Sequence, residues 1–299
     1  MRFVARRVAR FIAIGLLASA GFSALAGDLE SGLRAYNGKD YAAALPALTR
    51  AAEAGNVQAQ TVVGWMYLRG EGTRNDPAQA SRWFGKAAAK GDAGAQYNLA
   101  MLLGAGNGVE QNLERALFWF RKAANQGHAG AQYNVGLMYA KGWGVAQDGK
   151  KAATWYEKAA AQDDDRAELA LGLLLQEGKE RPRDLTRAAF WYGKAAAHDD
   201  PVAQTNLANL YASGEGVPRD INKAVALYRK AAAHGNVGAQ FNLGMVYSMG
   251  MGVAVDYVQG YHWLARAERQ GVAQAAGMRA FVESRMSPDQ LAAARARSD

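Results

Sequence analysis

The feature that most constrains this chain is a period of 36 residues that runs through most of its length. When the sequence is shifted against itself by one period, six units align without a gap. The six units begin at Val57, Ala93, Ala129, Asp165, Pro201 and Val237. A fixed period in the range of about 20–50 residues is typical of repeat proteins, whose units bury their apolar surfaces against one another. The sequence therefore predicts a stack of units, whatever its length alone suggests about domains.

Several columns of the alignment hold one kind of residue. Glycine fills the column Gly70, Gly106, Gly142, Gly178, Gly214 and Gly250. Small residues fill the column Gly64, Ala100, Gly136, Gly172, Ala208 and Gly244. Large side chains fill the column Trp83, Trp119, Trp155, Trp191, Leu227 and Trp263. Small residues let helix axes approach closely, and we expect the aromatic columns to fill the space between units as core.

Each unit is predicted to contain two helices. In the third unit, apolar residues recur from Ala131 at i, i+4, i+7 and i+8, which indicates a helix over 129–141. Gly142 then ends it, and Asp148 stands where an N-cap is needed for a second helix that runs to about Ala161. The cap column reads Asp76, Asn112, Asp148, Asp184, Asp220 and Asp256. The column that closes the second helix reads Gly91, Gly127, Asp163, Asp199, Gly235 and Gly271.

The third unit carries a specific resemblance. Its run AGAQYNVGLMYAKGWGV over 129–145, followed by Asp148 and by Trp155-Tyr156, is similar to the Sel-one-like repeat, a relative of the tetratricopeptide repeat. The resemblance covers 57–272. It implies an all-α fold, an α/α right-handed superhelical solenoid of helix-turn-helix repeats, which holds other proteins.

The flanking segments extend the predicted stack. Residues 28–56 resemble a shorter, tetratricopeptide-like first unit, and 273–299 are expected to form C-terminal capping helices. Within them, Ser287-Pro288-Asp289-Gln290 has the pattern of a helix N-terminus. We therefore expect 27–299 to form a single solenoid domain.

The first 26 residues have the pattern of a secretory signal peptide. Arg6, Arg7 and Arg10 precede an apolar run from Phe11 to about Gly21, and Ala24-Leu25-Ala26 is a small-x-small cleavage site. The run is shorter than the ~20 residues that a membrane-spanning helix needs, although a retained anchor stays open as an alternative. We expect cleavage after Ala26, a periplasmic or secreted protein, and no stable membrane insertion after cleavage.

Charge and cysteine usage exclude several function classes. The net charge is +8, but the predicted signal peptide holds four arginines and no acidic residue, so 27–299 carries only +4. That value gives no reason to expect nucleic acid as a partner. The chain has no cysteine, which removes disulfides, thiolate metal sites and cysteine nucleophiles.

We find no pattern for catalysis. HExxH, GxSxG and P-loop motifs are absent from the sequence. The histidines His128, His198, His234 and His262 fall near the ends or outer faces of second helices, and we interpret them as structural or solvated. We interpret the acidic runs at 163–165 and 199–200 as solvated turns. The predictions are therefore no catalytic residue, no cofactor and no metal site.

The exposed side of the first helices is the remaining candidate surface, because in such a superhelix these helices line the concave face. An asparagine column lies beside an apolar column there, and the two suit an extended peptide, since amides pair with its backbone while apolar contacts select side chains. The candidate partner-binding residues are Trp65, Asn98, Met101, Asn134, Leu137, Asn206, Asn209, Asn242 and Met245. The alternative is that the asparagines bond within the stack and the apolar residues pack locally.

The fourth unit departs from the pattern. Glu168 replaces a glutamine, Leu175 replaces a tyrosine, and the loop over 177–184 is charged. This loop is either a second contact point or sequence drift.

Together these features predict an exported, non-catalytic scaffold of a bacterial envelope, monomeric by default, that binds a protein or extended peptide. One alternative is a cell-wall or β-lactam hydrolase. Another is a periplasmic regulator of a membrane sensor or of a polysaccharide-export system.

Overall fold

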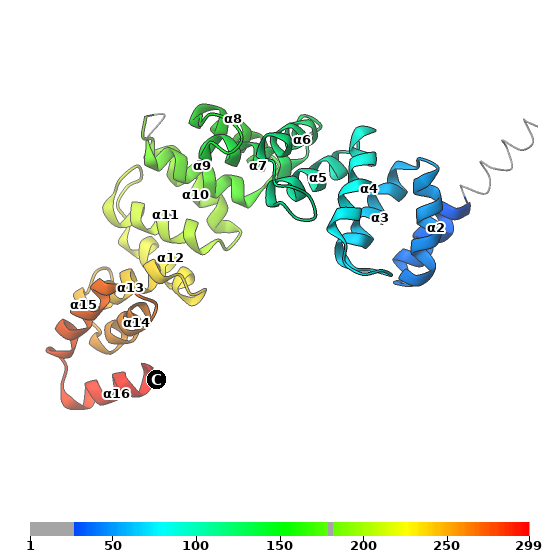
Figure 1. Cartoon of the computed structure of the whole chain (residues 1–299). Helices are drawn as coiled ribbons and strands as arrows, with labels where there is room; N and C mark the ends of the chain where they lie inside the picture. The colour runs from blue at the N-terminus through cyan, green and yellow to red at the C-terminus, as the bar shows by residue number, and fades with distance from the viewer. Residues whose placement is uncertain (1–26, 179–181, 299) are drawn as a thin grey trace, which may run out of the picture. The chain divides into compact units, whose positions relative to one another are not determined.

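The structure is a computed structural model that describes residues 27–178 and 182–298. The predicted signal peptide and residues 179–181 of the charged loop lie outside the described residues. Over the described ranges, helix is the only regular secondary structure, and the helices follow one another in antiparallel pairs (Figure 1). This confirms the predicted all-α class.

Every 36-residue unit contains a first and a second helix, as predicted. The first helices are α3 (Val57–Arg69), α5 (Ala93–Ala105), α7 (Ala129–Lys141), α9 (Asp165–Glu177), α11 (Pro201–Ser213) and α13 (Val237–Met249). The second helices are α4 (Pro77–Ala89), α6 (Leu113–Asn125), α8 (Gly149–Ala160), α10 (Leu185–Ala197), α12 (Ile221–Ala233) and α14 (Tyr257–Arg269). Before them, 27–37 are helical and α2 spans Tyr41–Glu53, and after them come α15 (Ala273–Glu283) and α16 (Pro288–Ser298).

Helix ends follow the predicted columns. Each first helix ends at a glycine in the left-handed conformation, with φ of 72° at Gly70 and 80° at Gly214. Each second helix begins at its Asp or Asn cap, whose side chain accepts a backbone N–H three residues later. These two features fix where the first helix ends and where the second helix begins in every repeat.

A second set of caps corrects the interpretation of the turns between units. The first helices are capped by Asn56, Asp92, His128, Asp164, Asp200 and Asn236. Asp164 and Asp200 are therefore helix caps rather than merely solvated acids. His128 belongs to the same set, because its Nδ1 accepts the backbone N–H of Ala131 at 3.2 Å.

The buried large side chains lie one residue further along the second helices than we expected. Trp83 is buried, but the tryptophans at 119, 155, 191 and 263 are only half-buried. The buried column is the next one, Phe84, Phe120, Tyr156, Tyr192, Tyr228 and Leu264. The indoles lie along the helix flank, where Lys86 Nζ is 4.0 Å from the ring centroid of Trp83 and Lys158 Nζ is 4.2 Å from that of Trp155. The column of small residues explains the enclosed rings, since a Cβ on Gly64 would lie 2.7 Å from the ring of Phe84.

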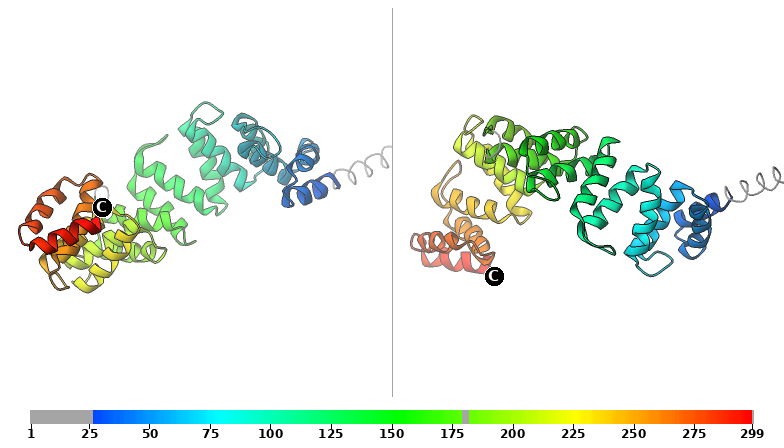
Figure 2. Two further views of the ribbon diagram at one scale, coloured as in Figure 1. Left: turned by 90° about the horizontal axis from the view of Figure 1, so that it is seen from below. Right: turned by 45° about the horizontal axis from the view of Figure 1, so that its top comes forward.

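The helices pack as two compact structural units, each larger than a 36-residue repeat. One ends at Gln147 and the other starts at Asp148. Within each, every first helix contacts those neighbouring second helices that the same unit holds. In the second unit, α15 and α16 both contact α14, and the red terminal helix lies beside the orange helices (Figure 2). The expectation of a single domain over 27–299 stays a prediction.

The C-terminal caps follow the sequence pattern. Ser287 Oγ accepts the N–H of Gln290 at 3.2 Å, and Gln290 Oε1 accepts the N–H of Ser287 at 2.9 Å, which is a reciprocal capping box.

Among the described helices, none has the length and apolar character required to cross a membrane.

Candidate functional site

Charged residues are unevenly divided between the two kinds of helix. The first helices α5, α11 and α13 contain no Asp, Glu, Lys or Arg, and α3 and α7 contain only Arg69 and Lys141. The first helix α9 is the exception among the six repeats, with charged residues at four positions. The second helices of the repeats all carry charges, such as Arg82 and Lys86 on α4. We call the exposed side of the first helices the first-helix face. Over most of its length this face is electrically neutral.

In the unit that ends at Gln147, the first-helix face is hollowed by a cavity of ≈ 420 Å³, which we call the α5–α7 pocket. Three predicted partner-binding residues, Met101, Asn134 and Leu137, lie in its wall. The full lining is Ala100, Met101, Gly104, Ala105, Gln111, Leu113, Ala116, Phe120, Asn134, Leu137, Met138 and Trp143. None of these side chains is titratable, so the pocket itself offers no general acid or base.

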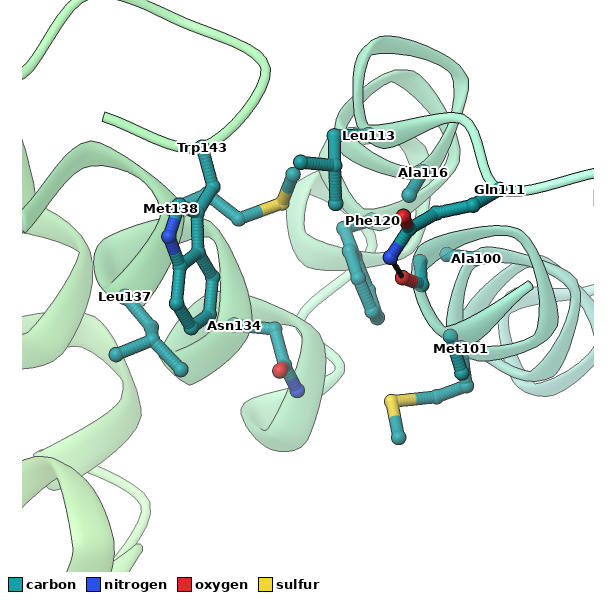
Figure 3. A pocket seen from close by; sticks show the side chains of 12 residues that line it. Ala100, Met101, Gln111, Leu113, Ala116, Phe120, Asn134, Leu137, Met138 and Trp143 are labelled. Atoms are coloured by element: carbon teal, nitrogen blue, oxygen red, sulfur yellow. Dashed lines mark hydrogen bonds between the residues drawn. The ribbon is translucent and has the colours of Figure 1, made fainter. Parts of the chain in front are cut away.

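The pocket is mainly apolar and open to solvent. Figure 3 shows Trp143 and Leu137 on one side of the opening, Met101 and Phe120 on the other, and Asn134 between them. Trp143 is 47% exposed and Met101 is 44% exposed. Gln111 at the rim donates its Nε2–H to the carbonyl of Gly104 at 2.8 Å. Large apolar side chains therefore meet solvent here instead of filling the core.

Small residues of α5 make room for this pocket. Where α5 has Met101, Gly104 and Ala105, the first repeat has the larger residues Trp65, Leu68 and Arg69. Trp65 itself lies edge-on against Phe84, with ring centroids 5.6 Å apart. The smaller residues of α5 leave the corresponding space empty.

Trp143 adds a wall that sequence reasoning missed. It lies in the loop that follows α7, at a column that holds Glu71, Asn107, Glu215 and Met251 in other repeats. A lone tryptophan in an otherwise mostly polar column was the available signal. Alignment of the repeats brings out the residues that the copies share, so a residue found in only one copy does not stand out.

Several predicted partner-binding residues of this unit are buried or make contacts within the protein itself. Asn98 is buried, and Asn134 donates its Nδ2–H to the carbonyl of Gly130 in its own helix at 2.7 Å. Trp65 is half-buried, with Arg69 stacked 4.6 Å from its ring centroid. Some of the asparagine column thus bonds within the stack, as the alternative interpretation held.

In the unit that starts at Asp148, the predicted residues are Asn206, Asn209, Asn242 and Met245. Asn209 is exposed, and the other three are half-buried. Two groups hydrogen-bond to Asn209 Oδ1, namely the hydroxyl of Tyr228 at 2.6 Å and Asn242 Nδ2 at 3.0 Å. The structure thus joins Asn209 and Asn242, which are 33 residues apart in the sequence. That these residues contact a partner stays a prediction.

No group of three or more His, Asp or Glu side chains in the described ranges is placed to hold a metal ion. His198 lies next to Glu168, with its Nε2 3.8 Å from Glu168 Oε2, and His234 is the C-cap of α12.

Comparison with known proteins agrees with this arrangement. The Sel1 repeat model matches 57–92, 93–128, 129–164, 165–200, 201–236 and 237–272, which are the six units of the sequence. Repeats of this family build binding scaffolds that are generally non-catalytic.

Two solved structures are similar to the chain. One is a protective antigen present in uropathogenic Escherichia coli strains that displays an SLR fold, with 31% identity and a TM-score of 0.81 over 94% of this chain. The match covers 61% of the antigen, so the chain spans less than two thirds of that protein. The other is a Sel1 repeat protein from Oxalobacter formigenes, with 34% identity, a TM-score of 0.68, and coverage of 80% of this chain and 96% of that one. The search of curated proteins found no match. With all six units matched and the SLR fold shared along nearly its whole length, the chain belongs to the Sel1 repeat family.

Proposed function

We propose that this chain is an exported, non-catalytic scaffold of the bacterial envelope that binds a neutral, apolar segment of a partner protein on its first-helix face. The α5–α7 pocket is the observation that carries the proposal. It combines solvent-exposed apolar side chains with a lining that has neither charge nor a titratable group. The lining offers no acid, base or nucleophile, which the hydrolase alternative would need at this place.

The chemistry of the lining sets the expected ligand. Trp143 and Phe120 offer aromatic surface, and Met101 and Met138 are flexible thioethers that adapt to different apolar shapes. A charged side chain entering such a pocket would lose its hydration without gaining an ionic partner. The partner therefore inserts an uncharged aliphatic or aromatic side chain into the pocket. The partner's backbone on either side of this side chain lies on the surrounding neutral surface.

Gly104 gives a sharp test of the pocket. A Cβ at this position would lie 3.7 Å from its nearest neighbour, Ala116 Cβ, which is an ordinary contact, and Leu68 occupies the same position in the first repeat. Gly104→Leu should therefore fill the pocket while preserving the helix, because leucine has a higher helix propensity than glycine.

The experiment selects peptides from a displayed random library on the full chain and measures their affinity by calorimetry. We expect selected peptides to share an uncharged apolar anchor, and Gly104→Leu to weaken them at least about tenfold, the equivalent of about 1.4 kcal/mol. Gly193→Leu is the matched control, since a Cβ there meets nothing within 4 Å and α10 lies in the other unit. Equal affinity of the wild-type and Gly104→Leu chains would contradict the proposed site.

Export is tested separately. The charged start, the apolar run and Ala24-Leu25-Ala26 support cleavage after Ala26. Expression of the full gene in a Gram-negative host should give a periplasmic or secreted protein whose N-terminal residue is Gly27. A cytoplasmic product that retains Met1 would overturn the envelope assignment while leaving the pocket intact.

A further inference from the structure

Asn209 on α11 departs from the column to which it belongs. The other repeats have apolar residues at its position, namely Trp65, Met101, Leu137, Leu173 and Met245. Asn209 is exposed and lies on a helix without any charged residue. A polar amide has thus replaced an apolar side chain at one position of the first-helix face.

Two hydrogen bonds to its oxygen fix the orientation of the Asn209 amide. Tyr228 on α12 is only 4% exposed, and its hydroxyl donates to Asn209 Oδ1 at 2.6 Å. Asn242 on α13 donates its Nδ2–H to the same oxygen at 3.0 Å. An amide oxygen has two lone pairs, and both are engaged here. Asn209 Nδ2, with its two N–H donors, is therefore turned away from the core.

The donor that fixes this orientation persists at neutral pH. Burial raises the pKa of Tyr228 to about 12, against the opposing effect of a hydrogen bond from Asn242. The phenol therefore stays protonated and continues to donate to Asn209 Oδ1.

Two polar groups remain available side by side. Asn209 Nδ2 can donate, and Asn242 Oδ1 can accept; neither is hydrogen-bonded to another described residue. Because α11 and α13 carry no charged side chain, neither of these helices offers an ionic partner to a carboxylate or an ammonium. A neutral group with one acceptor and one donor matches the pair, and a peptide group has both.

We infer that Asn209 and Asn242 form a preorganised amide pair that binds the backbone of the partner, Asn209 Nδ2 donating to a peptide carbonyl and Asn242 Oδ1 accepting a peptide N–H. This rests on the proposed function, because it names what the same protein recognises at a second place on the first-helix face. The α5–α7 pocket selects an apolar side chain, whereas the amide pair reads main-chain groups and is indifferent to sequence.

The test uses the peptides selected on the full chain, synthesised with one backbone N–H at a time replaced by N–CH₃. Calorimetry should show one N-methyl position that weakens binding to the wild-type chain at least tenfold. The same peptide should lose no more than about twofold on Asn242→Leu, because the acceptor for that N–H is already gone. Asn209→Leu, which introduces the residue found at Leu173, should weaken the unmodified peptide about tenfold.

A pair of tyrosine variants separates orientation from packing. Tyr228→Phe keeps the ring but frees the Asn209 amide, and should weaken binding about threefold to fivefold. Tyr192→Phe is the matched control, because the hydroxyl of Tyr192 donates to Gln176 Oε1 at 2.5 Å and not to an asparagine. It should leave the affinity unchanged.

The outcomes distinguish the two proposals. Peptides that bind the chain but are insensitive to N-methylation and to Asn209→Leu would overturn the amide pair and leave the scaffold function standing. Equal losses from Tyr228→Phe and Tyr192→Phe would also overturn it, because the effect would then be structural. If the wild-type chain binds no library peptide, both proposals fail.

Discussion

At the scale of single residues, a hydrogen bond from a buried glutamine links consecutive repeats. Gln60 donates its Nε2–H to the carbonyl of Ala52 at 2.9 Å, and Gln96 does the same to Ala88 at 3.1 Å. The same bond recurs from Gln132, Gln204 and Gln240. Each bond joins a first helix to the second helix before it and satisfies a polar group inside the core. Glu168 is the exception in this column.

Glu168 is the basis of a stability prediction. It is fully buried, its Oε1 lies 3.3 Å from Lys194 Nζ and its Oε2 lies 3.8 Å from His198 Nε2, and the Lys194 side chain is 39% exposed. Burial of a carboxylate costs desolvation free energy, and an ion pair with a partly exposed lysine offsets only part of that cost. Glu168→Gln, which restores the column, should raise the free energy of unfolding by about 1 kcal/mol in urea titrations.

The reciprocal variant is the control for this prediction. Gln204→Glu introduces the same carboxylate one repeat later and should lower the unfolding midpoint. A lower midpoint for Glu168→Gln would show that the ion pair outweighs the desolvation cost.

Close helix approach gives a second prediction at this scale. A Cβ on Gly172 would overlap the ring of Tyr192, which is fully buried and has no room to move. Gly172→Ala should therefore destabilise the fold by about 2 kcal/mol. Gly193→Ala, on the same helix pair but with open space around it, should stabilise by about 0.5–1 kcal/mol because alanine favours the helix. Thermal unfolding of both variants checks the opposite signs, and a shared sign would contradict the packing argument.

At the scale of elements, side-chain caps define where helices begin. Asp220 caps α12, and its Oδ1 accepts the backbone N–H of Lys223 at 3.0 Å. This hydrogen bond is the main cause that lowers the pKa of Asp220, with the ion pair to Lys223 adding to it. A cap of this kind stabilises both the orphan N–H groups and the positive end of the helix dipole.

The cap predicts a pH dependence. Because folding lowers the pKa of Asp220, its ionised form stabilises the fold above its unfolded pKa of about 3.9, and this contribution is lost as the pH falls through the folded pKa. Asp220→Ala should therefore lower the unfolding temperature at pH 7, and the difference from wild type should shrink below about pH 4. Asp220→Asn, the residue that caps α6 as Asn112, should retain most of the stability at pH 7. A wild-type to alanine difference that stays constant down to pH 2 would rule out the charged cap.

At the scale of the whole molecule, the ends of a repeat stack must be closed, because each repeat exposes an apolar side where a neighbour is missing. In the unit that starts at Asp148, α16 closes this side. Ala294 of α16 is buried in a cluster with Tyr261, Leu264 and Val282. Arg279 strengthens the same end, since its guanidinium lies 2.6 Å from Glu268 and 2.7 Å from Glu283.

Removal of α16 tests this closure. A chain ending at Arg285 should keep its helicity but expose the apolar cluster around Leu264, and should self-associate at concentrations where the full chain does not. Light scattering coupled to size exclusion measures the change. A truncated chain with the same mass distribution as the full one would show that α16 is dispensable for solubility.

How far the candidate site follows from the sequence depends on the residue. The periodicity identified Met101, Asn134 and Leu137 as exposed residues of first helices, and the structure places them in one pocket. The periodicity gave no indication that Phe120 and Trp143 line the pocket, because their access to it depends on the size of the neighbouring side chains. Trp65 and Asn98 are less exposed than expected, since Trp65 packs on Phe84 and Asn98 is buried, and their contact with a partner stays a prediction.

The sequence by itself determined the helices of this protein, their boundaries and their order. Caps, glycine terminators and apolar spacing act over a few residues, and repetition displays each of them six times. Tertiary structure decided which side chains are enclosed, as with Tyr228 rather than its neighbour Leu227, and which polar groups meet, as with Asn209 and Asn242. Such outcomes depend on packing between different helices, where a smaller side chain leaves room for a pocket and one buried hydroxyl orients an amide.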